Sequence, residues 1–136
     1  MSNRQERLKP YREMRQRYRP DRRAFERLVS EVLEALPVPF LEKLSNIAVV
    51  VADHPTKSGA RAAGLQPADD LLGLYQGTPY GERGTGYHLV PPDRITIYRQ
   101  PILAVCCSEE DVREEIRATV LHEIGHYFGL SDAELD

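Results

Sequence analysis

The chain has 136 residues, of which 41% are hydrophobic and 29% are charged, and its formal net charge is −3. This length and composition predict one globular domain with a core of its own. No uninterrupted apolar run is longer than Ile47–Ala52, and the N-terminus lacks the apolar stretch of a secretory signal, so we expect a cytoplasmic protein without a membrane segment.

The N-terminal segment, residues 1–20, is rich in arginine. Through Arg23 the chain carries nine Lys/Arg and three Asp/Glu, whereas the remainder is acidic. Pro10 and Pro20 interrupt the segment, and it has little apolar surface to bury, so we expect a solvated, partly disordered arm before a domain of residues 21–136. The alternative is that the arm contacts nucleic acid, an anionic surface or the domain's own acidic face.

The domain begins with a predicted helix that Asp21 caps. Its apolar residues recur at intervals of three and four, which indicates one buried face: Phe25, Leu28, Val29, Val32, Leu33 and Leu36. The helix should stop before Pro37, because the residue ahead of a proline is displaced from the helical conformation. A short helical turn is expected over residues 40–44.

Three strands follow in the prediction. Ile47–Ala52 is apolar on both faces, which is typical of a central strand covered on both sides. Residues 71–76 form a second strand, in which Gly73 marks a bulge or a place where another backbone comes close. Residues 94–99 alternate polar and apolar side chains, which predicts a half-buried strand. The intervening segments, 53–70 and 77–88, lack apolar periodicity and are predicted to be loops.

The two cysteines, Cys106 and Cys107, are adjacent in the sequence. Neighbouring residues on an extended segment point to opposite faces, so a disulfide between them would be strained. We expect two free thiols.

The last predicted helix carries the residues that are candidates for metal binding and catalysis. Ser108 and Asp111 form a capping box, so the helix should begin at Glu109. An i, i+4 row should pack against the sheet: Val112, Ile116, Val120, Ile124 and Phe128. Beside this row, His122 and His126 are four residues apart on one face and can present two imidazole nitrogens to one metal ion, with Glu123 next to them.

The spacing continues beyond the second histidine. Gly129 can end the helix in the left-handed conformation, and Asp132 could then turn back to the metal. Three protein ligands with one open position are typical of catalytic zinc sites, whereas structural sites usually have four. The pattern therefore predicts Zn²⁺ held by His122, His126 and Asp132, with Glu123 beside the two histidines.

The segment from His122 to Asp132, together with residues 71–75 and 92–99, resembles the bacterial minimal-zincin family of small neutral zinc metallopeptidases. The resemblance extends over about residues 22–135. It implies an α+β, reduced zincin-like fold, in which a small mixed sheet packs against an N-terminal helix and a C-terminal active-site helix. It also implies zinc ligation by His122, His126 and Asp132, general-base chemistry at Glu123 and a cytoplasmic setting.

The function that we expect is hydrolysis of peptide bonds by a zinc-activated water, with Glu123 as general base and a peptide or protein as substrate. The strand at residues 71–76, if it lies at a sheet edge, could pair with an extended peptide. Two alternatives stay open. One is a non-catalytic module that keeps zinc for structure or binds a partner through its arm. The other is a metal-dependent ribonuclease with RNA on the basic arm, against which Glu123 argues, because a nuclease has no evident need for that acid.

Overall fold

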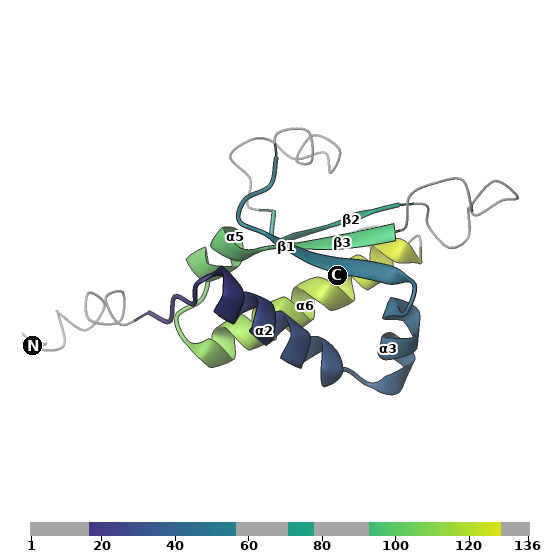
Figure 1. The fold of residues 1–136 in the computed structure, drawn as a ribbon, viewed down its shortest axis with the longest axis horizontal. Coiled ribbons are helices and arrows are strands. Elements are labelled where there is room, and N and C mark those ends of the chain that lie inside the picture. The colour runs from purple at the N-terminus through teal and green to yellow at the C-terminus, as the bar shows by residue number, and fades with distance from the viewer. Residues whose placement is uncertain (1–16, 57–70, 78–92, 129–136) are drawn as a thin grey trace, which may run out of the picture.

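The computed structural model describes residues 17–56, 71–77 and 93–128. Its elements are, in chain order, α2 (Arg22–Glu34), α3 (Val38–Leu44), β1 (Ile47–Ala52), β2 (Gly73–Gln76), β3 (Asp93–Tyr98), α5 (Arg99–Ala104) and α6 (Glu109–Tyr127). Figure 1 shows a small sheet with α2 and α6 on one side of it. The predicted α+β class, with a small mixed sheet packed on an N-terminal and a C-terminal helix, is confirmed.

The three strands form one mixed sheet in the order β1-β3-β2. Strand β1 runs parallel to β3, with Ile47 opposite Asp93, and β2 runs antiparallel to β3. Within the described sheet β3 is therefore central, and the prediction that Ile47–Ala52 is the central strand is wrong. Burial agrees with this order, because Val50 of β1 is 39% exposed while Ile95 of β3 is fully buried.

Strand β3 and the segment after it also differ from the prediction. Arg94 alone is exposed in β3, and even Asp93 and Thr96 are buried, so the polar and apolar alternation does not mark a solvated face. The chain then enters helix α5 at Arg99, where the sequence pattern predicts no helix. Pro101 lies in the first turn of this helix, where a proline is tolerated because its missing N–H would have no helical partner.

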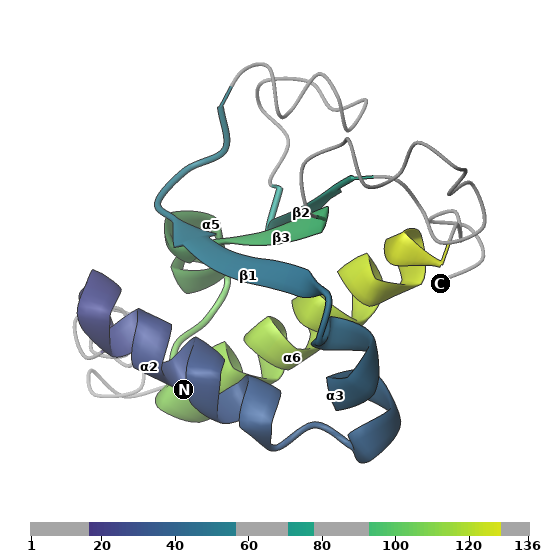
Figure 2. The same ribbon diagram turned by 45° about the vertical axis from the view of Figure 1, so that its right-hand side comes forward.

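The N-terminal helix follows its predicted pattern. The Asp21 side chain accepts a hydrogen bond from the Ala24 N–H at 2.8 Å, as a cap should. Helix α3 begins at Val38, two residues earlier than the predicted turn, with Pro39 in its first turn. In both ribbon views α2 and α6 lie on the same side of the sheet, and α3 lies next to the start of β1 (Figure 2).

The core lies between the sheet and the helices α2 and α6. Its fully buried side chains are Phe25, Ile95, Ile97, Ile102, Val112, Ile116 and Val120. Each such side chain contributes roughly 1.5–3 kcal/mol through removal of apolar surface from water. The predicted i, i+4 row of α6 is buried as far as Ile124, but Phe128 is the C-cap residue and is 37% exposed, so the row ends one step earlier than predicted.

Residues 17–20 contact the connection between α5 and α6. The Tyr18 N–H donates to the Cys107 carbonyl at 2.9 Å, and Arg17 Nε donates to the Cys106 carbonyl at 3.0 Å. Residues 1–16 of the predicted basic arm lie outside the described part, so its disorder and the domain boundary at residue 21 stay predictions. None of the helices within the described ranges has the length and apolar character that crossing a bilayer requires.

Candidate metal centre

The candidate site lies at the C-terminal end of α6. The helix begins as predicted, because the Ser108 hydroxyl accepts a hydrogen bond from the Asp111 N–H at 3.0 Å and the Asp111 carboxylate accepts one from the Ser108 N–H at 3.3 Å. The N–H groups of Cys107 and Ser108 hold the pKa of the Asp111 carboxyl below its ordinary value. From this cap the helix continues to Tyr127, which brings His122 and His126 into its final turns.

The two histidines point toward a common position. Their Nε2 atoms are 3.2 Å apart, and their ring centroids are 4.9 Å apart. In tetrahedral zinc sites, where Zn–N bonds measure about 2.0–2.1 Å, two coordinating nitrogens lie about 3.3 Å from each other. The pair therefore has the separation that zinc chelation requires. Both side chains are partly exposed, so a ligand can reach them.

Glu123 is the buried member of the group. The residue is 7% exposed, and its two carboxylate oxygens face different neighbours. Oε1 accepts a hydrogen bond from the backbone N–H of Tyr75 at 2.8 Å, and Oε2 lies 4.0 Å from His122 Nε2. One ligand atom from each of His122, Glu123 and His126 lies within 4.8 Å of the others. One oxygen is thus held by β2 while the other lies on the side of the imidazoles.

Strand β2 approaches α6 closely at Gly73. A Cβ atom on Gly73 would lie 2.5 Å from Thr119 Cγ2 and 3.2 Å from the Thr96 carbonyl oxygen, and neither distance leaves room for it. The prediction for Gly73 is a bulge or a close approach of another backbone; the structure shows a close approach, but its nearest atom belongs to the Thr119 side chain and the Thr96 backbone comes second. The contact between the Tyr75 amide and Glu123 had no signal in the sequence, because every residue except proline has a backbone N–H.

A series of aromatic and cation–π contacts links the site to α3. The rings of Tyr75 and Tyr127 meet edge to face with centroids 5.8 Å apart, and those of Tyr127 and Phe128 are 4.8 Å apart. The Lys43 ammonium lies 4.7 Å from the Phe128 centroid and 5.4 Å from that of Phe40. Edge-to-face and cation–π contacts of this kind contribute about 0.5–1.5 kcal/mol each, so they help hold the end of α6 against β2 and α3.

The third predicted ligand cannot be placed. Asp132, like the predicted helix-ending Gly129, lies outside the described residues, so its role stays a prediction. Most of the predicted loops 53–70 and 77–88 also lie outside them. In residues 17–56, 71–77 and 93–128, the cluster suited to a metal consists of His122, Glu123 and His126, and the exposed His54 does not belong to it.

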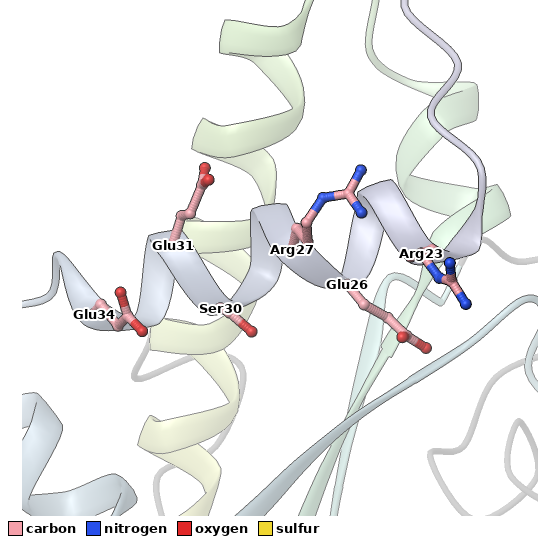
Figure 3. Close-up of a pocket in the computed structure, with 6 residues that line it drawn as sticks. All are labelled: Arg23, Glu26, Arg27, Ser30, Glu31 and Glu34. Atoms are coloured by element: carbon pink, nitrogen blue, oxygen red, sulfur yellow. The ribbon is translucent and has the colours of Figure 1, made fainter.

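A second surface feature lies on α2. Figure 3 shows an open depression there, lined by Arg23, Glu26, Arg27, Ser30, Glu31 and Glu34. These side chains carry both signs of charge and come from one helix, and Glu31 is paired with Arg113 of α6 at 2.6 Å. The depression offers no imidazole or thiolate and shares no residue with the histidine pair, so it is not the candidate metal centre.

Comparisons with known proteins agree with this geometry. A family model described as zincin-like metallopeptidase matches residues 44–136. Among solved structures, a conserved hypothetical protein from Thermo thermophilus is similar, with 25% identity and a TM-score of 0.52 over 80% of this chain and 94% of that one. No curated protein matches the sequence. Since the family match covers both the sheet and the whole histidine-bearing helix, the chain belongs to the zincin-like metallopeptidase family.

Proposed function

We propose that this protein is a zinc-dependent peptidase in which Glu123 acts as the general base. The observation that carries the proposal is the geometry of His122, Glu123 and His126, in which two imidazole nitrogens stand 3.2 Å apart beside a buried carboxylate. Membership of the zincin-like metallopeptidase family supports a metal-dependent, peptidase-like function.

The residues present fit a zinc ion. His122 and His126 would bind it through Nε2, and we propose Asp132 as the third ligand; two imidazoles and one carboxylate are a common donor set for catalytic zinc. When bound, zinc supplies the Lewis acidity that activates a water molecule and polarises a peptide carbonyl. The role of the protein side chains is then to hold the ion and to move protons.

We assign the proton transfer to Glu123. Its Oε1 accepts the Tyr75 N–H, so Oε2, on the side of the histidines, is the oxygen that would take a proton from the attacking water. The same atom would pass the proton to the nitrogen of the leaving amine as the peptide bond breaks. Burial of the carboxylate limits competing contact with solvent.

We further propose that the substrate is an extended segment of a peptide or protein. Strand β2 lies at an edge of the described sheet, because the strand order is β1-β3-β2. It also packs directly against α6. Extended peptides commonly add to such an edge through main-chain hydrogen bonds. The predicted cytoplasmic setting stays a proposal.

The first test joins metal analysis to peptide cleavage. We expect the purified protein to bind close to one equivalent of zinc and to cleave casein or a mixture of fluorescence-quenched peptides. His126→Ala should lose both properties. Glu123→Ala should retain zinc and lose cleavage, because the ligands remain while the base is removed. Cleavage at an unchanged rate in Glu123→Ala would falsify the proposal, and zinc binding without cleavage in the unmodified protein would favour the non-catalytic alternative.

A further inference from the structure

The backbone N–H of Tyr75 points away from the rest of the sheet. Strands β2 and β3 are antiparallel, and the Tyr98 N–H donates to the Leu72 carbonyl at 3.0 Å. In an antiparallel pair the residues that exchange hydrogen bonds alternate with those that do not. Leu72, Leu74 and Gln76 therefore turn their backbone groups toward β3, and Gly73 and Tyr75 turn theirs to the opposite side. The Tyr75 donor is thus directed at the edge of the sheet.

That donor meets the Glu123 carboxylate of α6. The Tyr75 nitrogen lies 2.8 Å from Glu123 Oε1, across 48 residues of sequence. Hydrogen bonds from a backbone N–H to an ionised carboxylate are short and about twice as strong as those between neutral groups. Because a backbone donor has no side-chain torsions of its own, its direction is set by the strand.

The distance between strand β2 and helix α6 is fixed at Gly73, next to this contact. Gly73 lies against Thr119 and also near Glu123, whose Cγ would be 3.5 Å from a Cβ on that glycine. Thr119 and Glu123 are four residues apart and therefore share one face of α6. Gly73 and Tyr75 are two residues apart and therefore share one face of β2. The close approach at Gly73 consequently brings the Tyr75 amide within reach of the carboxylate.

We propose that the Tyr75 backbone amide is the positioning group for Glu123, so that strand β2 directs the general base toward the histidine pair. Holding Oε1 leaves Oε2 on the side of His122, which is 4.0 Å away. A carboxylate with free torsions would sample other orientations, and misplacement of a catalytic group by about 1 Å can cost on the order of a hundredfold in rate. This inference rests on the proposed function for its catalytic consequence, while the contact itself can be measured without any substrate.

The first experiment measures hydrogen exchange at single amides in the zinc-loaded full-length protein by NMR. We expect the Tyr75 amide to exchange about tenfold faster in Glu123→Ala than in the unmodified protein, because its acceptor is removed. Glu123→Gln is the matched control, since its side-chain oxygen can still accept the hydrogen bond although it cannot act as a base. The amides of Leu74 and Gln76, which face β3, should change by less than about twofold in either variant. Equal Tyr75 exchange in the unmodified protein and in Glu123→Ala would overturn the proposal.

The second experiment compares two substitutions at the donor. Tyr75→Ala removes the ring and keeps the N–H, whereas Tyr75→Pro removes both; an edge strand tolerates proline where the N–H does not pair with the sheet. Relative to Tyr75→Ala, we expect Tyr75→Pro to lower kcat at least about tenfold, with KM and zinc content changed by less than about twofold. Equal kcat in the two variants would overturn positioning while leaving the peptidase proposal intact. Cleavage that survives in Glu123→Ala would instead remove the proposed function, and the exchange measurement would still decide whether the contact exists.

Discussion

Gly73 lies directly against Thr119, so closely that a Cβ on the glycine would come within 2.5 Å of the Thr119 methyl carbon. The second obstacle is the Thr96 carbonyl oxygen at 3.2 Å, which belongs to the backbone of the central strand β3 and cannot rotate away. Gly73 has an ordinary negative backbone angle, so the glycine is required for space and not for conformation. The contact between these two residues sets how near the edge strand comes to the helix that carries the candidate site.

Adding a methyl group at this contact should destabilise the protein. We expect Gly73→Ala to lower the free energy of unfolding by about 1–3 kcal/mol, because overpacking a close contact forces backbone shifts. Thr119→Ser removes the obstructing methyl, so it should recover part of this loss when combined with Gly73→Ala. Urea denaturation of the two single variants and the double variant measures the coupling. Strictly additive effects would show that the steric contact is not the cause.

Zinc should stabilise the protein through the predicted ligands. A metal that binds the folded state alone adds about 2.7 kcal/mol to the free energy of unfolding when its concentration is a hundred times Kd. We expect zinc to raise the thermal midpoint, a chelator to reverse the rise, and His122→Ala to abolish it. Differential scanning fluorimetry at fixed protein concentration measures these changes.

The same measurement tests Asp132, which the structure does not describe. Asp132→Ala should reduce zinc affinity by at least about tenfold if this side chain is the third ligand. Asp136→Ala removes a carboxylate near the end of the chain at a position outside the motif, and it should leave zinc affinity unchanged. Equal affinities in the two variants would contradict the assignment of Asp132.

The pair of Arg99 and Asp53 should make stability depend on pH. Arg99 Nε donates to Asp53 Oδ1 at 2.8 Å, and this hydrogen bond lowers the pKa of the Asp53 carboxyl below its ordinary value of 3.8. Because the folded-state pKa is lowered, the stabilisation is present above pH 3.8 and is lost as the pH falls through the folded-state value. Asp53→Asn should therefore lower the thermal midpoint at pH 7, and the difference from the unmodified protein should shrink below pH 3.8. A difference that stays constant with pH would contradict the linkage.

The two thiols should differ in reactivity. Cys106 is 3% exposed, and burial together with nearby carboxylates raises its pKa to about 11, whereas Cys107 is exposed. Since the thiolate is the reactive form, iodoacetamide at pH 8 should modify Cys107 first and Cys106 only after unfolding. Intact mass spectrometry over time measures the number of labels, and peptide mapping identifies the residue. Rapid addition of two labels to the folded protein would show that Cys106 is more accessible than its burial indicates.

The sequence by itself determined the parts of this protein that depend on local geometry. Residues four apart meet on a helix whatever surrounds it, so the approach of His122 to His126 followed from their spacing. Helix caps are equally local. Asp21 and Ser108 are the N-caps of α2 and α6, as the surrounding sequence predicts. The i, i+4 apolar row of α6 is also buried where the periodicity placed it, up to Ile124.

The tertiary structure decided what depends on contacts between distant segments. The apolar character of Ile47–Ala52 cannot distinguish a central strand from an edge strand, and it was β3 that took the central position in the described sheet. A backbone N–H carries no sequence signal, so the contact of the Tyr75 amide with Glu123 became visible only when β2 was placed beside α6. The histidine pair is thus a property of one helix, whereas the orientation of the carboxylate next to it requires the folded sheet.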